Sequence, residues 1–186
     1  IGDAVMSGFQ TPPHLIDAVQ RAMRDGHNGY LPSAGILDAR EAVATDYATR
    51  GISVSADRVL ITAGSSEAID IALNALVNEG DEVLVPTPTY PLYTAVLGKI
   101  NATPKYYRTG PERDWHPDIE HLRSLVTPRT RVLVVNDPNN PTGAVYPSLV
   151  RHALIDLAEQ HGLTILADEV YAELGFEGAV PPLATL

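Results

Sequence analysis

The alternation of short apolar runs with longer amphipathic runs constrains the fold of this chain more than any other feature. Apolar runs of about five residues, each predicted to be a buried strand, lie at 59–63, 82–85, 131–135 and 163–167. Strands of this length joined by helices are typical of a mostly parallel sheet with helices on both faces. We therefore expect an α/β fold, a three-layer sandwich around a mostly parallel central sheet.

The amphipathic runs predict the helices around that sheet. The first begins at Thr11-Pro12-Pro13, because proline suits a first helical turn, and ends near Gly26. Further helices are expected at 36–50, 67–78, 92–97 and 148–161.

The composition excludes several kinds of function. Thirteen Lys and Arg against 23 Asp and Glu give a net charge of −10, which disfavours binding to a nucleic-acid backbone. No apolar run approaches the ~20 residues that cross a bilayer. The chain has no Cys, which fits a reducing compartment and a cytoplasmic location. Its six His residues form neither H-x-H nor H-E-x-x-H, so we expect no metal site.

Ligands of parallel sheets bind beyond the carboxyl ends of the strands, so we expect the functional residues in the segments that follow strands. The first is Gly64-Ser65-Ser66, between a predicted strand and a predicted helix. Outward N–H groups, the helix dipole and two hydroxyls favour an anion, and a phosphate in particular. An ordinary capped turn would contain the same residues.

Two further loops combine proline with side chains suited to a planar ligand. In the loop 86–91, three prolines restrict the chain around Tyr90, whose ring could lie flat on a ligand or pack on the next helix. In the loop 136–143, Asn140 offers both a donor and an acceptor for a phenolate or carboxylate oxygen. A plain turn-rich connection is the alternative for the second loop.

The fourth segment places an acidic residue directly after an apolar strand. Asp168 is expected to be partly buried, and an ionised carboxylate there needs a cationic partner. No Lys or Arg is near it in the sequence, so a ligand cation such as a pyridinium nitrogen would serve. Tyr171 lies three residues on and would share its face in a helical turn. A helix-start aspartate favoured by the dipole is the alternative.

Taken in this order, the four segments resemble the class I/II aminotransferases, which are fold-type I enzymes dependent on pyridoxal 5′-phosphate. The most specific likeness is Asn140-Pro141-Thr142-Gly143 followed by Asp168-x-x-Tyr171. Within that family the chain is most similar to the alanine aminotransferase branch, through the stretches 88–93, 114–119 and 139–146.

The resemblance implies a role for each segment around the cofactor. Gly64, Ser65 and Ser66 would bind its phosphate, and Tyr90 would stack on its ring. Asp168 would pair with the ring nitrogen.

It also implies contacts on the substrate side and across a homodimer. Asn140 would hydrogen-bond the phenolic oxygen of the ring, shared with Tyr171, and Gly2 and Asn140 would contribute to substrate binding. Tyr171 and Asp168 would be the catalytic residues of this chain. Tyr30 would reach the phosphate in the partner subunit.

The chain departs from the family in one respect. The family reacts through a lysine that forms a Schiff base with the cofactor, in a Ser-x-x-Lys setting, and neither Lys99 nor Lys105 matches it. We therefore expect a fragment whose lysine, and an arginine for the substrate carboxylate, follow Leu186. Residues 1–30 would form an N-terminal arm and first helix, and 31–186 part of the large cofactor-binding domain.

These observations predict a cytoplasmic, dimeric aminotransferase that moves an amino group between an amino acid, alanine in the first place, and 2-oxoglutarate as the 2-oxo acid. Two alternatives remain open from the sequence. A carbon–sulfur lyase would use the same loops, because the cofactor carries the chemistry. An aminotransferase-like effector domain of a transcription regulator would use them without catalysis.

Overall fold

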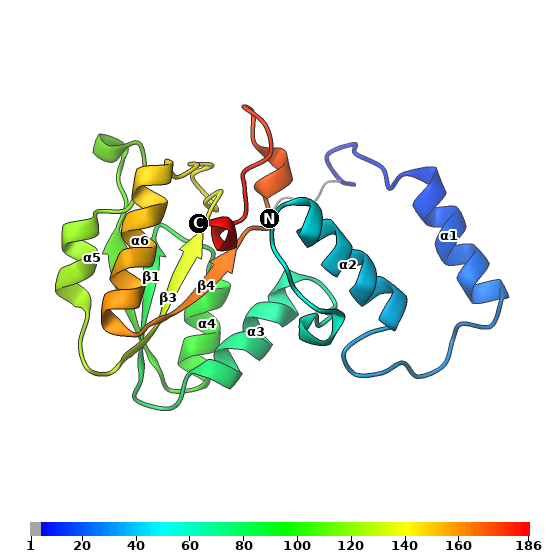
Figure 1. Ribbon diagram of the computed structural model, residues 1–186, viewed down its shortest axis with the longest axis horizontal. Helices are drawn as coiled ribbons and strands as arrows, with labels where there is room; N and C mark the ends of the chain where they lie inside the picture. The colour runs from blue at the N-terminus through cyan, green and yellow to red at the C-terminus, as the bar shows by residue number, and fades with distance from the viewer. Residues whose placement is uncertain (1–4) are drawn as a thin grey trace.

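The computed structural model of the chain describes residues 5–186 and confirms an α/β fold (Figure 1). A four-stranded sheet lies at its centre, with the order β2-β1-β3-β4 and every neighbouring pair parallel. The strands are β1 (Glu82–Thr87), β2 (Thr103–Arg108), β3 (Thr130–Asn136) and β4 (Thr164–Asp168).

Helices connect and cover these strands. They are α1 (Pro13–Arg24), α2 (Leu37–Thr49), α3 (Ser65–Leu76), α4 (Leu92–Lys99), α5 (Ile119–Leu125) and α6 (Ser148–His161). Figure 1 shows α5 and α6 on one side of the sheet and α3 and α4 on the other.

Alternation along the strands divides the core between the two faces of the sheet. Val83 and Val85 of β1 pack with buried residues of α3 and α4, including Leu73 and Tyr93. Leu84, between them, belongs to the cluster on the opposite face, which α5 and α6 complete. Both faces are therefore covered, as the continuous apolar character of the strands predicts.

The sequence reading and the structure differ in three places. Residues 59–63 do not form a strand, because no strand of the described chain lies beside them to share a ladder of hydrogen bonds. The edge strand β2 was not predicted, since only Tyr107 of its residues is fully buried. Helix α5 was not predicted either; its first turn is capped by Asp118, whose carboxylate accepts from the His121 N–H.

The N-terminal helices stand apart from the sheet. Helix α1 has no buried residue, and Figure 1 places it at the far end of the molecule from the strands. Among residues 5–186, no helix is both long and apolar enough to cross a membrane.

Candidate functional site

A cavity of about 1030 Å³ lies beyond the carboxyl ends of β1, β3 and β4. All four segments singled out in the sequence contribute residues to its wall. The predicted site residues that line it are Ser65, Tyr90, Asn140, Asp168 and Tyr171. The parallel sheet thus gathers side chains from four separate stretches of sequence at one edge.

Asp168, the last residue of β4, is the acidic group of this cavity. The register of the sheet sets it beside Asn136, the last residue of β3. Its carboxylate accepts hydrogen bonds from the Tyr93 hydroxyl and the Val170 N–H. No arginine or lysine of residues 5–186 forms an ion pair with it. A half-buried carboxylate in that setting is suited to a cationic ligand.

Tyr93 contributes to this site through Asp168, and the sequence analysis did not single it out. It is fully buried on α4, and its ring meets that of Tyr90 edge to face, with the centroids 6.1 Å apart. Burial, followed by the charge and hydrogen bond of Asp168, raises the pKa of Tyr93 far above its ordinary value. The hydroxyl therefore stays protonated and donates a hydrogen bond to Asp168. Its position three residues after Tyr90 was the only signal in the sequence.

The loop that carries Asn140 is fixed by backbone and side-chain hydrogen bonds. The Asn136 side chain accepts from the Asn140 N–H at 2.6 Å and donates to the Asp168 carbonyl at 3.3 Å. Asn139 accepts from the Thr142 hydroxyl at 2.9 Å, and its carbonyl accepts from the Gly143 N–H. These bonds hold the loop against the end of β4, so that Asn140 reaches the cavity.

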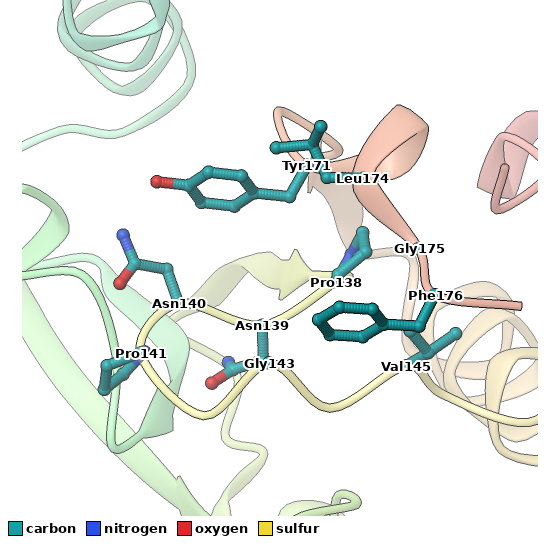
Figure 2. Close-up of a pocket in the computed structure, with 10 residues that line it drawn as sticks. All are labelled: Pro138, Asn139, Asn140, Pro141, Gly143, Val145, Tyr171, Leu174, Gly175 and Phe176. Carbon is teal, nitrogen blue, oxygen red and sulfur yellow. The ribbon is translucent and has the colours of Figure 1, made fainter. Parts of the chain in front are cut away.

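Asn140 and Tyr171 also border a second cavity, of about 320 Å³, on the outer side of the same loop. Figure 2 shows the Asn140 amide and the Tyr171 hydroxyl directed to the same side, although they come from the ends of different strands. In the segment that follows Tyr171, the Phe176 ring lies against the loop and Leu174 lies beside Tyr171. The pair of polar groups is well placed to bind one oxygen atom of a ligand.

The amino terminus of α3 faces the same edge of the sheet. Gly64 precedes it with a φ of +92°, a conformation that favours glycine, and Ser65 begins the helix. The Ser66 hydroxyl lies 3.4 Å from that of Tyr90. Free N–H groups at the helix start and the positive end of its dipole favour an anion here.

Not every predicted site residue of the described chain lines the cavity. Tyr30 lies in the segment between α1 and α2 with its side chain fully exposed, and it is not among the residues that line the cavity. Gly2 lies outside the described residues. In the part of the chain that is described, no group of three or more His, Cys, Asp or Glu residues is arranged to hold a metal ion.

Fold and cavity together define an α/β protein with a cavity at the carboxyl edge of its parallel sheet. Comparison with known proteins then gives the family: the chain belongs to the class I and II aminotransferases, whose family pattern matches residues 3–185.

Curated relatives carry names of several aminotransferases. Glutamate-pyruvate aminotransferase AlaA of Escherichia coli is 39% identical over 99% of this chain and 46% of its own length. Alanine aminotransferase of Mycobacterium bovis is 41% identical over 96% of the chain and 42% of its own length. Aspartate/prephenate aminotransferase of Thermus thermophilus is 40% identical over 91% and 44%.

Solved structures agree with this assignment. The alanine aminotransferase from Pyrococcus furiosus matches with a TM-score of 0.96 and 36% identity, over all of this chain and 47% of that one. An aspartate aminotransferase of Thermus thermophilus matches with a TM-score of 0.92 and 38% identity, over 96% and 47%. The chain therefore spans about half the length of the relatives that it matches.

Proposed function

We propose that this chain forms the cofactor-binding part of a pyridoxal 5′-phosphate-dependent aminotransferase. The observation that carries the proposal is Asp168, a carboxylate that lines the cavity with no arginine or lysine of the described chain as its partner. The membership of the class I and II aminotransferases supports it independently.

The residues of the cavity fit the cofactor group by group. A protonated ring nitrogen matches Asp168, because an opposite charge nearby stabilises the charged form of a titrating group. A phenolic oxygen matches the Asn140 amide and the Tyr171 hydroxyl, which point to the same side. A phosphate matches the start of α3 at Gly64, Ser65 and Ser66.

In the mechanism that we propose, the bound cofactor supplies an electron sink for the carbon that loses its proton. Asp168 would keep a proton on the ring nitrogen, and the Tyr93 hydroxyl, which donates a hydrogen bond to its carboxylate, would orient Asp168. Asn140 and Tyr171 hold the phenolic oxygen, where fixed donors need little reorganisation as charge develops. The Tyr90 ring, which lines the cavity, would cover one face of the ligand and exclude water.

The substrates and the assembly belong to the same proposal. Alanine and 2-oxoglutarate are the proposed amino donor and acceptor, supported by the names of the alanine and glutamate-pyruvate aminotransferases among the relatives. Gly2 and Asn140 are proposed on the substrate side. Tyr30 is proposed to reach a partner subunit in a cytoplasmic homodimer, and residues 1–30 to form an arm beside the larger unit 31–186.

The activity is tested on the whole protein that contains this chain. With pyridoxal 5′-phosphate, alanine and 2-oxoglutarate, we expect pyruvate and glutamate in equal amounts, and no more than one equivalent of pyruvate per active site when 2-oxoglutarate is omitted. A carbon–sulfur lyase would instead release ammonia and pyruvate from a sulfur-bearing amino acid with no acceptor. Cofactor binding without turnover of either kind would favour the effector-domain alternative.

A further inference from the structure

A buried ion pair lies directly beneath the loop that carries Asn140. Arg151 of α6 is 5% exposed and Asp137, the second residue of the loop, is 2% exposed. The Arg151 Nε atom lies 3.1 Å from Asp137 Oδ2. Neither residue lines the 1030 Å³ cavity, so the pair is not part of the ligand-contacting wall.

Each member of the pair connects different parts of the site. The other carboxylate oxygen of Asp137 accepts from the Tyr146 N–H at 3.0 Å, and its own N–H donates to the Asp168 carbonyl at 3.1 Å. Arg151 Nη2 donates to the Pro181 carbonyl at 2.6 Å. One guanidinium therefore joins the Asn140 loop to the segment that returns beside β4 after Tyr171.

Stability alone is a poor reason for such a pair. Removing two charges from water costs free energy that their attraction often fails to return, and apolar replacements of similar volume are frequently as stable. What an arginine adds is geometry, since its planar group donates in fixed directions to two acceptors at once. Here one guanidinium forms an ion pair with Asp137, in the loop that carries Asn140, and donates a hydrogen bond to the Pro181 carbonyl, in the segment that follows Tyr171.

We propose that Arg151 is a positioning residue for the cofactor site: through Asp137 and the Pro181 carbonyl, it fixes the loop so that Asn140 faces the cavity beside Asp168. The role toward the cofactor rests on the proposed function. The order of the loop does not, so it can be measured without any ligand.

The test uses Arg151→Met in the whole protein that contains this chain, with two readouts. The first is hydrogen exchange of the Asn140 N–H, which Asn136 protects in the unaltered chain. The second is the dissociation constant for pyridoxal 5′-phosphate. We expect exchange at Asn140 to be at least about 10-fold faster and the affinity to fall by about 5-fold or more, on the scale of a lost charge-assisted hydrogen bond.

The matched control is Arg129→Met, which removes an arginine from another buried carboxylate, Glu82, at the opposite end of the sheet. It is expected to lower stability while leaving Asn140 exchange and cofactor affinity unchanged. Asp137→Asn combined with Arg151→Met removes both charges and keeps an acceptor for Tyr146. We expect the double variant to recover stability relative to Arg151→Met, but not Asn140 protection or affinity.

Unchanged Asn140 exchange in folded Arg151→Met would overturn the positioning role, as would recovery of all three quantities together in the double variant. If Arg151→Met does not fold, Arg151→Lys provides the same comparison, because lysine keeps the charge and lacks the planar guanidinium group that contacts both Asp137 and the Pro181 carbonyl. Failure of the unaltered chain to bind pyridoxal 5′-phosphate would contradict the proposed function instead, and the exchange readout would still decide the order of the loop.

Discussion

The carboxylates at the two ends of the sheet differ in whether a cationic side chain pairs with them. At the amino end, Glu82 is buried and paired with Arg129 at 2.8 Å, and Asp81 is paired with Arg131 at 3.3 Å. At the carboxyl end, Asp168 has a tyrosine hydroxyl and a backbone N–H but no cationic side chain of the described residues.

This difference distinguishes carboxylates whose charge stabilises the fold from a carboxylate whose charge can bind a ligand. Where the chain supplies its own counter-charge, the carboxylate serves the fold. Where a carboxylate lines a cavity without one, its charge is left for a bound cation.

Asp168→Asn is expected to lower the turnover of the whole protein by roughly 100-fold. The Asp168 charge would raise the pKa of the cofactor's ring nitrogen by about two units, and each unit changes its protonation equilibrium about tenfold. The amide still accepts from Tyr93, so the fold should persist. Steady-state kinetics with circular dichroism measures both. Asp81→Asn, at the other end of the sheet, is the control, and turnover equal to wild type in Asp168→Asn would refute the role.

Glu82→Gln should lower the free energy of unfolding by about 1–2 kcal/mol at neutral pH, because it weakens the buried hydrogen bonds from Thr127 and Arg129. The Thr127 hydroxyl first, and then Arg129 and the charge of Lys105, lower the pKa of Glu82 from 4.5, against an opposing effect of burial.

The sign of the pH dependence follows from that lowered pKa. The contribution of Glu82 is complete above 4.5 and disappears as the pH falls through its lower value in the folded chain. Urea unfolding should therefore show the wild type and Glu82→Gln converging in acid. The exposed Glu120, changed to Gln, should have no such effect, and a constant difference at every pH would contradict this account.

Tyr93→Phe is expected to weaken pyridoxal 5′-phosphate binding by about 10-fold, because it removes a charge-assisted hydrogen bond that orients Asp168. Tyr107→Phe is the matched control, since that buried hydroxyl donates to the Val134 carbonyl at 2.9 Å on the other face of the sheet. Calorimetric titration measures both. Equal losses in the two variants would mean that the effect is one of packing.

Ser65→Ala should have the smallest effect, about a 3-fold loss of affinity for pyridoxal 5′-phosphate, because the N–H groups of α3 remain after a neutral hydroxyl is removed. Pyridoxal, which has no phosphate, should bind both proteins equally. Titrations with the two ligands make the comparison, and an equal loss for pyridoxal would place Ser65 elsewhere in the site.

The sequence alone predicted the elements that carry strong periodicity or dense motifs. The apolar runs placed β1, β3 and β4, and the segments after them line one cavity. By contrast, β2 has little buried side-chain pattern, and 59–63 has the composition of a strand but no neighbour among the described residues. Strand formation depends on a partner, which a local pattern does not contain.

The residues that support the site were harder to predict than those that line it. Tyr93 contacts Asp168, which is far away in the sequence, and Arg151 pairs with Asp137 at the other end of the Asn140 loop; only the packing of α4 and α6 brings each pair together. An arginine within an apolar helix face was a signal for Arg151, but its partner was not readable.

The most direct test of the comparison is the protonation of the ring nitrogen in bound pyridoxal 5′-phosphate, measured by ¹⁵N chemical shift with the labelled cofactor at mildly alkaline pH. Our account predicts a protonated nitrogen in the unaltered chain and an unprotonated one in Asp168→Asn. An unprotonated nitrogen in the unaltered chain, or the same protonation in both proteins, would contradict it.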